Sequence, residues 1–73
     1  MTLDEAKEGE VLRVTLLHAE GSLAQRLRAL GLGEGETFTL LRATRGRRVF
    51  YVRTARATAA LGAESAHLIG VEK

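Results

Sequence analysis

Two pairs of histidine and glutamate are the residues of this sequence whose types suit a metal ion. His18 and Glu20 flank Ala19, and Glu64 and His67 lie three positions apart. Each pair offers one imidazole nitrogen and one carboxylate, whereas a stable transition-metal site usually takes three or more ligands from the protein. The chain has no cysteine to supply another ligand. We therefore expect no metal site and no cofactor.

Catalytic groups are equally sparse. Ser22 and Ser65 suit the starts of helices better than the role of a nucleophile, and no acid–base pair stands out. The glycines at positions 31, 33 and 35 resemble a phosphate-binding loop, but they follow a helical pattern. A dinucleotide-binding loop instead follows a strand and opens a helix. The sequence therefore predicts a protein that is not an enzyme.

Arginine is concentrated in the middle of the chain. Residues 1–36 have a net charge of −3, residues 37–63 have +6 with no acidic residue, and the remainder has −1. Such a segment is typical either of the solvent face of strands or of a nucleic-acid-binding surface. Only one of Phe50 and Tyr51 can share a face with the arginines, so we keep nucleic-acid binding as the alternative. The arginines concerned are Arg42, Arg45, Arg47, Arg48, Arg53 and Arg56.

The clearest local pattern is a short helix between residues 22 and 30. Ser22 is a good N-cap, and Gln25 three residues on predicts a capping box. Leucines at positions 23, 27 and 30 then fall on one helical face. Gly31 stands where a left-handed residue usually ends a helix, and Leu32 can fold back onto the last turn.

The pattern of the remaining residues predicts mainly strands. Thr2 and Glu5 suit the capping of a single helical turn before Gly9. Leu12, Val14 and Leu16 then alternate with polar residues as in a half-buried strand. The expected elements are strands at 11–17, 37–43, 49–52, within 54–61 and at 67–72, a hairpin loop at 44–47 and a helical turn at 63–66. The expected core is Leu12, Val14, Leu16, Leu23, Leu27, Leu30, Phe38, Leu40, Val52, Ile69 and Val71.

Five short strands and one helix in 73 residues predict a single, mainly β domain that closes into a small barrel. The first residues are acidic where a secretion signal would be basic, and no apolar run approaches the roughly 20 residues that cross a bilayer. We therefore expect a cytoplasmic protein without direct membrane insertion; its oligomeric state is left open.

Three segments resemble the FeoA family of bacterial ferrous iron uptake. They are L-D-E-A-K-E-G-E near the start, G-S-L-A-Q-R-L-R-A-L-G-L-G-E-G-E at 21–36 and A-E-S-A-H-L-I-G-V-E at 63–72. The resemblance implies an SH3-like barrel of about five strands, with one short α-helix between the first and second strands. It also implies kinship with the C-terminal domain of iron-dependent repressors, which adds a stand-alone sensor domain with weak transition-metal contact as a further alternative.

The same resemblance implies a non-enzymatic accessory role in iron transport and a partner, the FeoB-like membrane transporter. If the leucines of the helix face inward, its other residues face outward and can form a protein–protein interface with the adjoining turn. The candidate partner-binding residues are Gln25, Arg26, Arg28, Ala29, Leu32, Gly33, Glu34 and Gly35.

Overall fold

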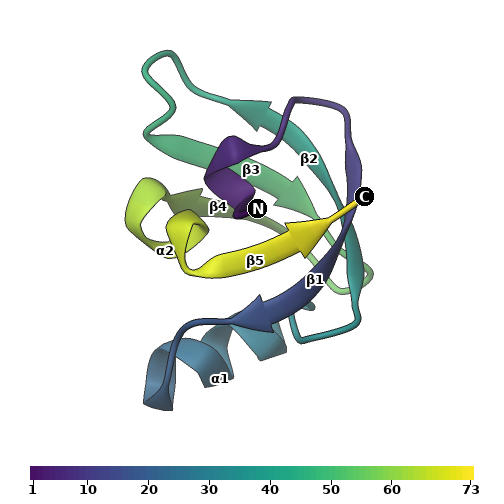
Figure 1. Cartoon of the computed structure of the whole chain (residues 1–73), viewed down its shortest axis with the longest axis vertical. Helices are drawn as coiled ribbons and strands as arrows, with labels where there is room; N and C mark the ends of the chain where they lie inside the picture. The colour runs from purple at the N-terminus through teal and green to yellow at the C-terminus, as the bar shows by residue number, and fades with distance from the viewer.

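Five β-strands, each antiparallel to its neighbours, dominate the computed structural model, which describes residues 1–73 (Figure 1). A short 3₁₀ turn precedes the first strand, and two helices interrupt the strand order. In chain order the elements are η1 (Leu3–Glu5), β1 (Val11–Leu17), α1 (Gly21–Ala29), β2 (Thr37–Ala43), β3 (Val49–Arg53), β4 (Thr58–Gly62), α2 (Ala63–His67) and β5 (Ile69–Glu72). The expected mainly β fold, with its helix between the first and second strands, is confirmed.

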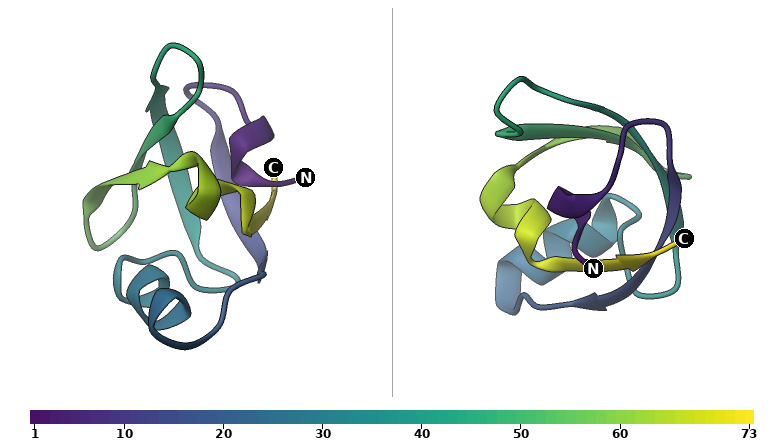
Figure 2. Two further views of the ribbon diagram at one scale, coloured as in Figure 1. Left: turned by 90° about the vertical axis from the view of Figure 1, so that its left-hand side faces the viewer. Right: turned by 45° about the horizontal axis from the view of Figure 1, so that its top comes forward.

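The sheet has the order β4-β3-β2-β1-β5 and curls into a barrel (Figure 2, right). Its two outer strands, β4 and β5, do not pair with each other, and α2 connects them. The outer edge of β5 is covered by the start of the chain, because Thr2 bridges to Gly70 and the Val71 amide donates to the Met1 carbonyl at 2.8 Å. The barrel is therefore closed by short segments rather than by a continuous ring of strand pairs.

One apolar core fills the barrel. Its largest fully buried side chain is Phe50, and Leu3 and Leu32 are also 0% exposed although none of these three was predicted. Eight of the expected residues are buried, and Leu23 and Leu30 are half-buried against the core. The buried eight are Leu12, Val14, Leu27, Phe38, Leu40, Val52, Ile69 and Val71.

The prediction that Leu16 belongs to the core is wrong. Its side chain is 50% exposed, whereas Leu17 is buried. The cause is an irregularity in the pairing of β1 with β5 between Val14 and Leu16, where the register shifts by one residue. Such a bulge reverses the alternation of inward and outward side chains beyond it.

The capping box predicted for Ser22 and Gln25 is also wrong. Helix α1 begins at Gly21 with Glu20 as its N-cap, and no side chain caps it. Gly21 has a φ of 62°, a left-handed conformation that glycine adopts without strain, and it is the first residue of the helix. Ser22 therefore lies inside the first turn and is exposed.

Candidate partner-binding surface on helix α1

The outward face of α1 is formed as the sequence predicts. Ala24 and Leu27 are buried against the barrel, and Gln25, Arg28 and Ala29 are exposed. The helix lies at one end of the barrel, away from η1 (Figure 2, left). The packed leucine and alanine fix the rotation of the helix, so the exposed side chains are presented in a fixed direction.

The turn that ends α1 is a Schellman motif. The Leu32 amide donates to the Leu27 carbonyl at 2.9 Å, and the Gly31 amide donates to the Arg28 carbonyl at 3.0 Å. Gly31 has a φ of 93°, which confirms the predicted left-handed residue. In addition, the hydroxyl of Thr54 donates to the Leu30 carbonyl at 2.5 Å, so the last turn is also tied to the end of β3.

Only half of the turn that was expected to adjoin the helix in the partner-binding surface, residues 32–35, is accessible. Leu32 and Gly33 are buried, so the prediction that they contribute to an exposed surface is wrong. Leu32 folds back into the core because the Schellman turn directs it there. Glu34 and Gly35 are exposed, and the Gly35 amide donates to the Val14 carbonyl at 2.8 Å.

Arg28 and Glu34 form an ion pair across this surface. The Arg28 guanidinium lies 3.5 Å from the Glu34 carboxylate, and both side chains are substantially exposed. Hydrogen bonding to a backbone amide lowers the pKa of the Glu34 carboxyl, and the positive charge of Arg28 lowers it further. An exposed pair of this kind contributes little to stability, because water screens the two charges. Both charges are therefore available to a partner at little cost.

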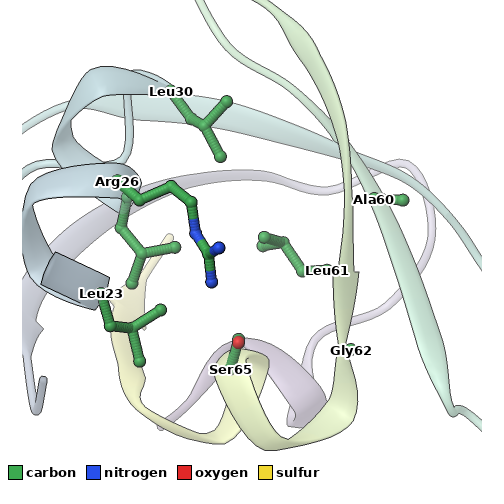
Figure 3. Close-up of a pocket in the computed structure, with 8 residues that line it drawn as sticks. Leu23, Arg26, Leu30, Ala60, Leu61, Gly62 and Ser65 are labelled. Carbon is green, nitrogen blue, oxygen red and sulfur yellow. The ribbon is translucent and has the colours of Figure 1, made fainter.

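Arg26 lies apart from this surface. Its guanidinium extends over a groove of about 360 Å³ between α1 on one side and β4 with the start of α2 on the other (Figure 3). The groove is lined by Leu23, Arg26, Leu27, Leu30, Ala60, Leu61, Gly62 and Ser65. The sequence does not predict this groove. Residues 54–61 fit a helix as well as a strand, so the pattern does not indicate whether the Leu61 side chain points into the barrel or away from it.

The six arginines of the alternative nucleic-acid surface are all exposed, but two of them are engaged within the molecule. The Arg47 guanidinium donates to the carbonyls of Asp4 and Ala6 at 3.1 and 2.5 Å and lies over the ring of Phe50. Arg42 lies over the ring of Tyr51, with 5.2 Å between guanidinium carbon and ring centre. Phe50 is fully buried, so Tyr51 is the single aromatic available for stacking on a base.

The histidine and glutamate pairs do not come together as metal ligands. His67 Nδ1 contacts Asp4 Oδ2 at 3.2 Å rather than Glu64, and no three His, Cys, Asp or Glu residues are grouped to hold an ion. Partial burial raises the pKa of the Asp4 carboxyl, but hydrogen bonds from Thr2 and His67 outweigh it and lower the pKa overall. The contact joins η1 to α2 and so acts as a tie between the two ends of the chain.

No helix of the protein has the length and apolar character needed to cross a membrane.

The strand order, the helix between β1 and β2 and the closing helical turn define a small SH3-like β-barrel domain. The chain belongs to the FeoA domain family, since the model of that family matches residues 1–73. A comparison with curated proteins found no match.

Solved structures place the same fold in transport proteins and in regulators. The FeoA protein from Chlorobium tepidum is 29% identical with a TM-score of 0.89, and the match covers 99% of this chain and 69% of that protein. The iron(II) transport protein A from Clostridium thermocellum is 24% identical with a TM-score of 0.89, covering 99% of this chain and 44% of that protein. The manganese-activated repressor ScaR is 27% identical with a TM-score of 0.86, and the match covers 100% of this chain but 35% of ScaR.

Proposed function

We propose that this protein is a non-catalytic, cytoplasmic accessory domain of ferrous iron uptake that binds a cytosolic surface of a FeoB-type transporter. The observation that carries the proposal is membership of the FeoA family over residues 1–73. The similarity to a FeoA protein over 99% of the chain supports it further.

The outer face of α1 and its exit turn are the proposed docking surface, consisting of Gln25, Arg28, Ala29, Glu34 and Gly35. The Schellman turn, the Thr54 hydroxyl and the buried Leu27 hold this surface in place before any partner arrives. A preorganised surface loses little conformational entropy on association, which matters when the contact area of a small domain is limited. The Arg28 and Glu34 charges would supply orientation and specificity.

The direct test is co-purification of the protein with a transporter from the same cells, followed by iron uptake in cells that lack the protein. Binding with reduced uptake in the deletion strain supports the proposal. A transporter that neither binds the protein nor depends on it for uptake contradicts it.

A second candidate is a stand-alone sensor domain, favoured by the match to ScaR, which spans the whole chain. In this alternative the domain would bind a regulator or a transition metal weakly. Mn²⁺ titration followed by amide NMR distinguishes it. Saturable line broadening confined to one cluster of residues favours the sensor, and its absence favours the accessory role.

A further inference from the structure

Strand β4 has one unpaired edge. It pairs with β3 along one side, and no other strand pairs with it. The opposite edge of the sheet, on β5, is covered by Met1 and Thr2, so β4 alone is left open. Proteins commonly guard an open edge with a charged residue or a proline, and Thr58–Gly62 contains neither.

The pairing with β3 defines which backbone groups of β4 point to the open edge. The Ala63 amide donates to the Arg48 carbonyl, and the Thr54 amide donates to the Ala57 carbonyl. In an antiparallel ladder hydrogen-bonded pairs alternate along the strand, so the backbone groups of residues 59 and 61 face β3. The amides of Ala60 and Gly62 and the carbonyl of Ala60 therefore point away from the sheet.

The open edge borders the groove beside α1. Ala60 and Gly62 line that groove together with the buried side chains of Leu27 and Leu61. Half-buried Leu23 and Leu30 form the wall on the helix side (Figure 3). An apolar floor next to a row of unused backbone donors and acceptors is the arrangement that binds an extended segment by strand addition.

Arg26 gives the groove its charge. Its guanidinium lies over the apolar floor in Figure 3 and takes part in none of the ion pairs or side-chain hydrogen bonds of the protein. The neighbouring Arg28 is instead paired with Glu34. A second copy of the chain, paired through β4, would place a second Arg26 at the same interface without an acidic residue to neutralise it. An acidic occupant is favoured over self-association for this reason.

We propose that the groove between α1 and β4 binds an extended acidic peptide segment, which adds to β4 as a sixth strand of the sheet. Four to five residues match the length of β4 at about 3.4 Å per residue. Apolar side chains at alternate positions of the segment contact the half-buried Leu23 and Leu30, and an Asp or Glu pairs with Arg26. This inference goes beyond the proposed function, because it concerns a different side of α1 and does not depend on which protein supplies the segment.

The test is selection of eight-residue peptides from a fully randomised displayed library by the immobilised protein. Enriched sequences are expected to carry apolar residues two positions apart and an Asp or Glu beside them. A selected peptide, added to saturation, is expected to slow hydrogen exchange of the Ala60 and Gly62 amides by about tenfold or more, since exchange requires the new bonds to open.

Two variants locate the site. Arg26→Glu is expected to weaken the selected peptide about tenfold or more, because a charge-assisted hydrogen bond is replaced by repulsion. Arg45→Glu reverses an exposed charge in the loop between β2 and β3, outside the groove, and is the matched control that is expected to leave the affinity unchanged. Gly62→Leu adds a bulky side chain to the lining of the groove at a position where an added Cβ meets nothing within 4 Å, and it is expected to weaken binding.

The proposal is overturned by a library without enrichment, by unchanged exchange at Ala60 and Gly62 in the complex, or by equal affinity for Arg26→Glu. Self-association of the protein through β4 in sedimentation experiments also overturns it. Because no transporter is present in these measurements, their outcome is independent of the proposed role in iron uptake.

Discussion

Gly31 lies so close to Thr54 that a Cβ added to the glycine would stand 2.6 Å from the threonine hydroxyl. The same residue has a φ of 93°, a conformation that other residues adopt only with strain. The end of α1 is thus constrained twice, by backbone conformation and by close packing. The predicted glycine stop is therefore also the contact that joins the helix to the end of β3.

Gly31→Ala is expected to destabilise the protein by about 2–4 kcal/mol, because the cost of a left-handed alanine adds to that of overpacking. Gly35→Ala is the matched control, since Gly35 has a similar φ of 86° but nothing within 4 Å of an added Cβ. The control is expected to cost about 1–2 kcal/mol. Urea unfolding of both variants measures the difference, and equal losses would show that the contact with Thr54 is unimportant.

Leu27→Ala is expected to cost about 2–5 kcal/mol, since the leucine is fully buried between α1 and the barrel. This is comparable with the whole stability of a small domain, so the variant should be largely or partly unfolded. Leu16→Ala provides the comparison: the half-exposed leucine should cost less than about 1 kcal/mol. Thermal melts of the two variants check the order, and a Leu27 variant that melts within a degree or two of the parent contradicts it.

The contrast between Leu16 and Leu17 indicates how far the sequence predicts this fold. Strand periodicity located β1 correctly and assigned Leu12 and Val14 to the core. It failed after the bulge, because a register shift depends on pairing with β5, a strand that is distant in the sequence.

In the candidate site, too, local sequence patterns predict some features, whereas contacts between distant parts of the chain are not predicted. The exposed positions of α1 and the conformation of Gly31 follow from local patterns. The groove beside Arg26 depends on where β4 lies relative to α1, and the partner of Arg47 on where the start of the chain folds back. Neither relationship leaves a signal in the spacing of residues along the chain.

Arg47→Ala is expected to destabilise the protein by about 1–3 kcal/mol, because two backbone carbonyls near η1 lose a charged donor. Arg48→Ala, which removes an exposed arginine without such bonds, should change stability by less than about 0.5 kcal/mol. Chemical unfolding of both variants is the measurement.

The same two variants test the nucleic-acid alternative. The parent protein is expected to bind single-stranded DNA or RNA negligibly at physiological salt. Micromolar affinity with a slope of roughly 0.7 log units per log unit of salt for each phosphate neutralised, weakened in the double variant, would overturn this expectation.

Acid stability is expected to depend on Asp4. Its pKa is lowered in the folded protein from the usual 3.8, so its contribution is present above about pH 3.8 and is lost as the pH falls through the lower folded value. Asp4→Asn should therefore show a shallower loss of stability below that pH. Melting temperatures between pH 2 and 6 measure the slope, with Glu64→Gln as an exposed control; identical slopes for parent and Asp4→Asn would rule out the contribution of Asp4.

Arg28 is the residue whose reversal should separate binding from folding. Arg28→Glu removes the exposed pair with Glu34 and should change stability little, because water screens the pair. It should nevertheless weaken binding of a FeoB-type transporter tenfold or more, as expected for an interfacial arginine. The double variant Arg28→Glu with Glu34→Arg restores an ion pair within the protein but leaves the charges exchanged. If the double variant recovers stability and still fails to bind, the loss of binding is not caused by the loss of the ion pair. The partner then contacts the charges at positions 28 and 34 directly. If Arg28→Glu alone binds the transporter at parental strength and supports normal iron uptake, this face of α1 is not the docking surface.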